Sequence, residues 1–128
     1  MKPQDGLVLE GGGIQLRIEY RRSQGDEGWT FHVYRKTPEA ELLRFDCFKK
    51  NPHYHYYYAP EGKNEVHAMD KSEIPIPLEW TVTQLKTRLA AMIEHAGYDA
   101  SAVAVDQEAV ARALSDSEKE IKGLEPSA

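Results

Sequence analysis

Two histidines separated by one residue, His53 and His55, are the side chains of this sequence best suited to chemistry. In a β-strand, alternate side chains lie on one face about 7 Å apart, close enough for two imidazoles to share a metal ion or a proton. A carboxylate on a neighbouring strand would orient either ring and raise its basicity. Asp46 and Asp70 flank the histidine segment on its two sides. The spacing therefore predicts a histidine–aspartate site.

Two chemistries are open to such a site. In the first, His53, His55, Asp46 and Asp70 supply the nitrogen and oxygen ligands of a divalent metal such as zinc or iron. In the second, no cofactor is needed: the histidines act as base and acid in phosphodiester cleavage, and Arg44 or Arg17 stabilises the charge that develops on phosphorus. Both chemistries use the same residue types, so both remain open at this stage.

Aromatic side chains on the same strands provide a surface for a substrate. Tyrosine rings on a sheet face can stack unpaired bases while arginines bind the backbone. The predicted catalytic residues are His53, His55, Asp46 and Arg44, and the predicted substrate-binding residues are Tyr57, Tyr34, His32 and Arg17.

A β-sheet is needed to position these residues, and the hydrophobic pattern of the sequence predicts one. Apolar and polar residues alternate in five segments separated by glycine, proline or asparagine turns: residues 14–21, 29–34, 42–48, 53–59 and 65–70. Short links between consecutive strands are typical of an antiparallel meander. The sequence thus predicts an α+β fold with a five-stranded antiparallel meander sheet.

Alternation also sorts the strands into two faces. The more apolar face is expected to be buried, and carries Trp29, Phe31, Val33, Leu43, Phe45, Cys47, Tyr54, Tyr56, Tyr58, Glu65, His67 and Met69. The other is expected to face water, and carries Arg17, Glu19, Arg21, His32, Tyr34, Arg44, Asp46, His53, His55, Tyr57 and Asp70. If residues 49–52 form a hairpin loop, Asp46 lies opposite His55. A turn at residues 61–62 places Asp70 opposite His53. Cys47 is expected to be a core thiol, and His67 a structural hydrogen-bonding residue.

The period changes to that of a helix after residue 77. Leu78, Val82, Leu85, Leu89, Met92 and Ala96 share one face, which predicts a long amphipathic helix over 78–97 packed on one side of the sheet. A capping box at Thr81 and Gln84, with Trp80 and Leu85 as a hydrophobic staple, is expected to open it, and Gly97 to end it.

Residues 101–122 predict a weaker helical region near the C-terminus. Asp106 is expected to cap its first turn, and Ser115 with Glu118 forms a second capping box. Its apolar face is thin, so the last ten residues are expected to be mobile, docking on a partner being the alternative. Residues 123–128 form a tail.

The whole chain of 128 residues has the length of one domain, 1–128, with sixteen basic and 21 acidic residues and a net charge of −5. That balance argues against nucleic-acid or membrane binding through bulk charge. Cys47 is the only cysteine, and no apolar leader or membrane-spanning stretch is apparent, so we expect a cytoplasmic protein without membrane contact. The Gly11–Gly13 run lacks phosphate-loop spacing, and residues 1–13 are expected to be a flexible N-terminal segment.

One segment resembles a known family. Leu43-Arg44-Phe45-Asp46, then His53-Tyr54-His55, then Glu73-Ile74-Pro75 and an amphipathic helix are similar to the TumE-type small bacterial toxins over residues 29–93. The resemblance implies a toxin–antitoxin component, with Asp46, His53 and His55 at the matching positions and a cognate antitoxin as partner. Cys47 stands where that family has asparagine, and residues 98–128 have no counterpart.

Three functions follow from these residues. The leading expectation is a small bacterial toxin-like protein acting on RNA. The alternatives are a protein-interaction module without catalysis, and a His-x-His metal-binding protein. Homodimerisation through an outer strand is compatible with each.

Overall fold

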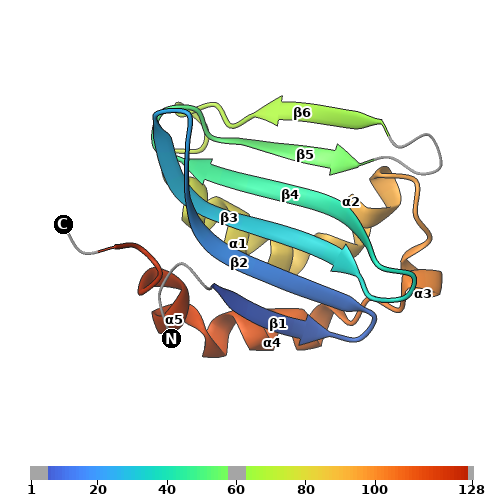
Figure 1. Ribbon diagram of the computed structural model, residues 1–128. Coiled ribbons are helices and arrows are strands. Elements are labelled where there is room, and N and C mark those ends of the chain that lie inside the picture. The colour runs from blue at the N-terminus through green and yellow to red at the C-terminus, as the bar shows by residue number, and fades with distance from the viewer. Residues whose placement is uncertain (1–5, 58–62, 127–128) are drawn as a thin grey trace.

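The computed structural model describes residues 6–57 and 63–126 and contains an antiparallel sheet with helices on one side (Figure 1). The strands are β1 (Leu7–Gly11), β2 (Ile14–Ser23), β3 (Asp26–Arg35), β4 (Ala40–Phe48), β5 (His53–Tyr57) and β6 (Asn64–Ala68). The helices are α1 (Pro77–Thr87), α2 (Leu89–His95), α3 (Ala100–Val103), α4 (Gln107–Asp116) and α5 (Glu118–Lys122). The α+β class and the antiparallel sheet are confirmed, but the sheet has six strands rather than five.

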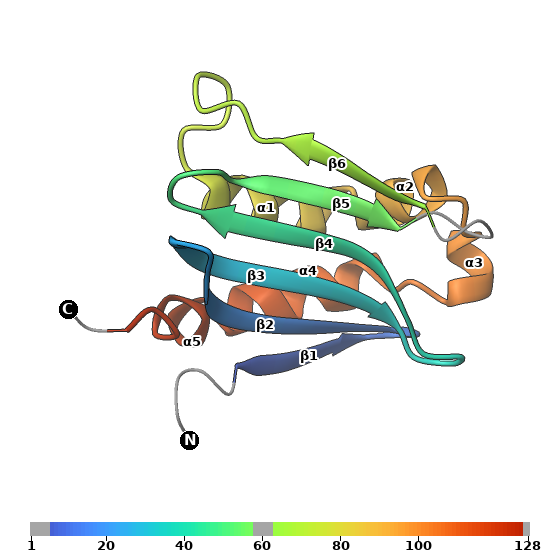
Figure 2. The ribbon, with the colours of Figure 1, turned by 45° about the horizontal axis from the view of Figure 1, so that its top comes forward.

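The strands follow the chain in the order β1-β2-β3-β4-β5-β6, which is the predicted meander with one strand added. In the described part of the chain the helices lie against one face, and the opposite face carries no helix (Figure 2). Helix α4 packs along β1, α1 packs against β4, and the two helices contact each other. The core lies between these layers, with Phe31 and Phe45 from the sheet and Leu85 from α1 fully buried.

The added strand β1 lies in the predicted flexible segment, so that prediction is wrong for residues 7–11. β1 pairs with β2 from Leu7↔Ile18 to Gly11↔Ile14. The glycines that follow permit a close approach to α3: the Gly13 N–H donates to the Ala104 carbonyl at 2.8 Å, and a Cβ at Gly13 would lie 1.9 Å from the Val103 oxygen. The glycine run therefore allows the backbone to pack closely against the end of α3.

The faces are sorted as predicted, but the pairing differs by two residues on both sides of β5. Asp46 lies opposite His53, not His55, and His53 lies opposite Ala68, not Asp70. The carboxylate of Asp26 accepts the N–H groups of Lys50 and Asn51 at 2.9 and 2.8 Å, which tightens the turn after β4. A shift of two residues exchanges neighbours and preserves faces. Tyr58 and the 61–62 turn lie outside the described residues.

The predicted helix over 78–97 is divided at Arg88 into α1 and α2. The side chain of Gln107 spans this break: its Nε2 donates to the carbonyls of Leu85 and Lys86 at 2.7 and 2.8 Å, and its Oε1 accepts the Ala90 N–H at 3.2 Å. One amide thus replaces hydrogen bonds that the interrupted helix lacks.

The predicted caps have mixed outcomes. Helix α1 begins at Pro77, where proline fits the first turn, so the capping box at Thr81 and the staple at Trp80 are wrong. Gly97 follows α2 with a φ of +92°, which confirms the predicted stop. Asp106 caps α4 by accepting the Ala109 N–H at 3.0 Å, which is also confirmed.

The second capping box, at Ser115 and Glu118, is wrong. Ser115 lies inside α4, and Ser117, which precedes α5, makes no side-chain cap.

The C-terminal region packs on the sheet. Ile121 and Leu124 are buried, and the Trp29 indole N–H donates to the Ile121 carbonyl at 2.7 Å. Among the described residues the expectation of mobility is therefore wrong, because α5 buries its few apolar side chains against the strands of its own chain.

Candidate functional site

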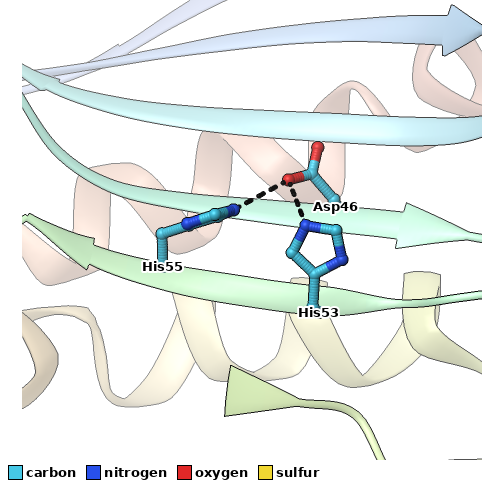
Figure 3. A group of neighbouring side chains, drawn as sticks. All are labelled: Asp46, His53 and His55. Carbon is cyan, nitrogen blue, oxygen red and sulfur yellow. Dashed lines mark ion pairs between the residues drawn. The ribbon is translucent and has the colours of Figure 1, made fainter. Parts of the chain in front are cut away.

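Two rows of side chains cross the uncovered face and bring the predicted catalytic residues together. One row runs Glu19, Thr30, Asp46, His53, Ala68, and the next runs Val8, Arg17, His32, Arg44, His55, Val66. Asp46, His53 and His55 point toward one another above β4 and β5 (Figure 3). Arg44 lies directly opposite His55.

Asp46 is fully buried although no helix covers it, so the expectation that it faces water is wrong. Its Oδ1 accepts from the Thr30 hydroxyl at 2.9 Å and the Arg21 guanidinium at 2.8 Å. Its Oδ2 accepts from the Arg44 Nε at 3.1 Å and lies 3.2 Å from the His53 Nε2. Longer side chains from three strands therefore enclose the carboxylate.

These contacts hold the carboxylate in its charged form. Burial opposes the charge, but the hydrogen bonds from His53 and Thr30 and the nearby Arg44 outweigh it, and the pKa of Asp46 falls well below its ordinary value. Asp46 is therefore an anion throughout the physiological pH range, and it binds and orients its neighbours without exchanging protons.

His53 has an acceptor at each ring nitrogen. Its Nδ1 lies 2.8 Å from the Asn51 carbonyl oxygen, and its Nε2 faces Asp46. Both nitrogens donate only when the ring is an imidazolium. Consistently, the hydrogen bond to Asp46 raises the pKa of His53 above its ordinary value, despite partial burial.

His55 has the opposite arrangement. Its Nδ1 lies 2.8 Å from the Asn64 amide oxygen, which accepts, while its Nε2 lies 3.0 Å from the Arg44 Nη2, which donates, and 3.4 Å from the Asp46 Oδ2. A neutral ring with its proton on Nδ1 satisfies both contacts. Burial lowers the pKa of His55, and with the charges of Arg44 and His53 it outweighs the hydrogen bond to Asn64 and the charge of Asp46, which raise it. The adjacent rings, 5.0 Å apart between centroids, thus favour different protonation states.

A surface depression of about 330 Å³ opens beside this cluster, with Arg21, Arg44 and His53 in its wall. Its remaining lining residues are Ser23, Gln24, Asp26, Phe48 and Asn51. Arg21 and Arg44 carry two positive charges and His53 adds a third when protonated, against the two negative charges of the enclosed Asp46 and of Asp26. The Asp26 carboxylate accepts from the backbone N–H groups of Glu27, Lys50 and Asn51, away from Asp46. The wall nearest Asp46 is therefore suited to an anion.

A metal ion could use the same residues, since ligand atoms of Asp46, His53 and His55 lie within 4.8 Å of one another. The surroundings disfavour a cation, because Arg21 and Arg44 donate to the carboxylate and Arg44 also donates to His55. Metal binding requires both arginines to move away from these atoms. The distances fit a metal, and the charges fit it poorly.

Tyr57 is the predicted substrate-binding residue that contacts this site. Its ring stacks on His55, with centroids 5.7 Å apart and planes 2° apart, and the Arg44 guanidinium carbon lies 5.9 Å from the ring centroid. Tyr57 thus packs against the two residues that lie opposite each other across β4 and β5.

The other predicted binding residues form a second cluster on the same face. His32 lies between two carboxylates, with Nε2 2.7 Å from Glu19 and Nδ1 2.6 Å from Glu41. Burial lowers the pKa of His32, but the carboxylates outweigh it and the net shift is upward. Arg17 lies over Tyr34, 3.9 Å from the ring centroid. A β-bulge between Val33 and Tyr34 places Glu41 opposite Tyr34 and beside His32.

Asp70 does not belong to the site. Its carboxylate accepts from the backbone and hydroxyl of Ser72, and the two-residue difference in pairing separates it from His53. The predicted ligand set is therefore wrong at this position.

Four contributors were not predicted as site residues: Arg21, Thr30, Asn51 and Asn64. Strand alternation places Arg21 on the uncovered face without assigning it to the site, and the same alternation could have found Thr30. The asparagines act through turn geometry and through pairing of β5 with β6, which the hydrophobic pattern does not encode.

Cys47 lies on the buried face, as predicted. It is 5% exposed and contacts the Thr81 hydroxyl at 3.3 Å. Burial raises the pKa of the thiol to about 12, so it is not a nucleophile at neutral pH. His67 makes the expected structural contact, with its Nε2 2.6 Å from the Glu65 carboxylate.

The fold and the site together define an α+β protein with an anion-compatible aspartate–histidine–arginine cluster on an uncovered sheet face. Residues 8–121 match the family model described as "Domain of unknown function (DUF7700)", and the chain belongs to this family. No curated protein and no solved structure matches it. None of the described helices combines the length and apolar character that a membrane crossing requires.

Proposed function

We propose that this protein binds single-stranded RNA on the uncovered sheet face and cleaves a phosphodiester by acid–base chemistry of His53 and His55. The observation that supports it is the contrast between the contacts of two adjacent histidines: both ring nitrogens of His53 face acceptors, whereas the Nε2 of His55 faces the Arg44 donor, so the pKa is raised in the first and lowered in the second. Titratable neighbours whose pKa values are displaced in opposite directions are typical of an acid and a base with separate roles.

The depression beside Asp46 supports phosphate binding. Arg21 and Arg44 present guanidinium groups to it, and these groups match the geometry of phosphate oxygens. A phosphate that draws the Arg44 Nη2 toward itself releases the lone pair on the His55 Nε2, which makes this ring available as a base. Tyr57, stacked on His55, offers an aromatic contact to a neighbouring base.

The reaction conserves protons. The Nε2 of His55 removes the proton of the ribose 2′-hydroxyl, and the 2′-oxygen attacks phosphorus. Arg21 and Arg44 stabilise the negative charge on the phosphorane oxygens. The Nε2 of His53 donates its proton to the departing 5′-oxygen as the P–O5′ bond breaks. The products are a 2′,3′-cyclic phosphate and a 5′-hydroxyl, and proton exchange with water restores both rings.

Cleavage of a labelled single-stranded RNA in the presence of EDTA tests this function. We expect products ending in a cyclic phosphate, and a rate that falls about 10²- to 10⁴-fold in His53→Ala and in His55→Ala. The matched control is His95→Ala, which replaces a histidine on α2 and should retain full activity. Intact RNA with the wild-type protein, or equal cleavage by all variants, would reject the proposal.

A cellular role as a toxin-like protein rests on the resemblance of residues 29–93 to TumE-type toxins. Expression in a bacterial host should inhibit growth, the double variant His53→Ala/His55→Ala should relieve the inhibition, and a cognate antitoxin should be encoded beside the gene. Harmless expression of the wild-type protein would reject this role. The proposed reaction would still be tested separately, by the RNA cleavage assay.

Metal binding is the second candidate, supported by the 4.8 Å cluster of ligand atoms. Protein purified without a histidine tag and saturated with zinc should retain one equivalent after desalting if this function is correct, and Asp46→Asn should lose it. A stoichiometry near zero would reject it. RNA cleavage in EDTA separates the two candidates.

A further inference from the structure

The edge strand β6 has the features of a self-complementary interface. It is the last strand of the sheet, so one row of its backbone N–H and C=O groups faces away from β5. Four of its five residues, including Val66, are exposed. Pairing with another strand would satisfy the outward row.

The direction of each backbone group follows from one hydrogen bond. The Met69 N–H donates to the Pro52 carbonyl at 2.9 Å, so residue 69 points its polar groups toward β5. These directions alternate along an antiparallel pair. Residues 67 and 65 therefore also point inward, and Asn64, Val66 and Ala68 point outward.

A two-fold axis at Val66 uses the whole outward row. Val66 then lies opposite Val66 of the second copy, Asn64 opposite Ala68, and Ala68 opposite Asn64, so the three outward residues pair only with one another. If the axis is centred on Glu65 or His67, one outward-pointing residue of β6 has no residue opposite it in β6 of the second copy. The strand length and the hydrogen-bonding pattern thus favour one register.

The side chains select the same register. Glu65 lies opposite His67 of the second copy, and by symmetry His67 lies opposite Glu65, so a carboxylate faces an imidazole at both positions. Within one chain the same two groups already contact at 2.6 Å. Centring on Glu65 would instead place two carboxylates side by side, which is unfavourable.

We propose that the protein forms a symmetric homodimer through antiparallel pairing of β6 with β6 of a second copy, centred on Val66. The two sheets become continuous, and their uncovered faces form one surface with two aspartate–histidine sites. Asn64, which orients His55, lies at the seam. This inference is independent of the reaction proposed above.

Sedimentation equilibrium of the full chain over a range of concentrations tests the dimer. The wild-type mass should rise to twice the 14.5 kDa of the chain. Val66→Pro removes an outward N–H and should raise the dissociation constant at least about tenfold. Val66→Lys should do the same through like-charge repulsion. Val8→Lys is the matched control on the other edge strand, where Val8 is 58% exposed against 54% for Val66.

A charge exchange tests the register. Glu65→Lys and His67→Glu should each weaken the dimer, because the first removes the carboxylate that faces His67 and the second places two carboxylates opposite one another, and the double variant should restore it. A monomeric wild-type protein at its highest soluble concentration would overturn the proposal. A dimer indifferent to both Val66 variants would also overturn it, and circular dichroism verifies that each variant is folded.

Discussion

Asp46 illustrates how residues on an uncovered face can still be buried. Four side chains, those of Thr30, Arg21, Arg44 and His53, direct donors at one carboxylate. Two of these donors, Arg21 and Arg44, are permanently charged, and the hydrogen bond to Asp46 raises the pKa of His53 and so favours its charged form. Each group fixes the ionisation of the next, so the cluster behaves as a unit.

Removing the charge of Asp46 should destabilise the fold. Asp46→Asn leaves Arg21 and Arg44 without their counter-charge, and we expect the free energy of unfolding to fall by about 3 kcal/mol in urea titrations at neutral pH. The control is Asp70→Asn, which replaces an exposed carboxylate whose only side-chain or backbone donors in the described structure belong to Ser72. Equal stability of the two variants would contradict the enclosed ion cluster.

The two histidines should titrate on opposite sides of their ordinary pKa of about 6.5. Because the pKa of His53 is raised, its stabilising contribution is complete below about pH 6.5 and is lost as pH rises through the folded-state pKa. Because the pKa of His55 is lowered, its contribution is present above about pH 6.5 and is lost as pH falls. NMR titration of the C2 protons, assigned with His53→Ala and His55→Ala, measures both; coincident curves would refute the assignment.

At the scale of the elements, the helix layer depends on polar contacts as well as on its apolar face. Gln107, the first residue of α4, supports the junction of α1 and α2. Periodicity alone predicts one continuous helix here, because the apolar stripe continues across Arg88. The interruption depends on a side chain some twenty residues further along the chain, and a local pattern contains no information on that contact.

Replacing Gln107 should therefore weaken the fold. Gln107→Ala leaves two carbonyls and one N–H without their partner, and we expect a loss of about 2 kcal/mol by chemical denaturation. Glu108→Ala, at the exposed neighbouring position, should be nearly neutral. If both variants lose the same amount, the junction contact is unimportant.

The contact between the Gly11–Gly13 run and α3 offers a second test at this scale. Gly13→Ala would bring a Cβ within 1.9 Å of the Val103 oxygen, and should cost about 3 kcal/mol. Gly25→Ala, where nothing lies within 4 Å but φ is +81°, should cost only the conformational penalty of about 1 kcal/mol. Thermal unfolding compares the two, and a neutral Gly13→Ala would show that residues 11–13 do not pack closely.

At the scale of the whole molecule, the C-terminal helices connect distant parts of the chain. Ile121 is 3% exposed, and its carbonyl accepts from Trp29 on β3. The sequence contains only isolated apolar residues after residue 115, and their burial depends on contacts of α5 with α4 and with Trp29. For this reason the hydrophobic pattern indicated a mobile end where the structure has a docked one.

Truncating the docked side chain should be costly. Ile121→Ala is expected to lower the free energy of unfolding by about 3 kcal/mol and to change the fluorescence of Trp29. Glu120→Ala, at an exposed position on the same helix, should leave both unchanged. Unaltered stability in Ile121→Ala would contradict docking of α5.

The sequence predicts on which face of the sheet each residue lies, but it does not predict which residues lie opposite one another on adjacent strands. Alternation alone places Asp46, His53 and His55 on one face, because a period of two fixes the side of each residue. The partner across each strand depends on the turn, and here Asp26, on a different strand, determines the turn after β4. A displacement of two residues therefore left the site on the right face and assigned Asp46 to the wrong histidine.

The enclosure of Asp46 has a kinetic consequence. Its cover consists of side chains, chiefly two long arginines, and the described helices all lie on the opposite face of the sheet (Figure 2). Rotamer changes of such groups occur in picoseconds to nanoseconds, whereas lids open in microseconds or more. A ligand that displaces Arg21 or Arg44 need not wait for any backbone rearrangement, so its arrival should be limited by diffusion and by electrostatic steering.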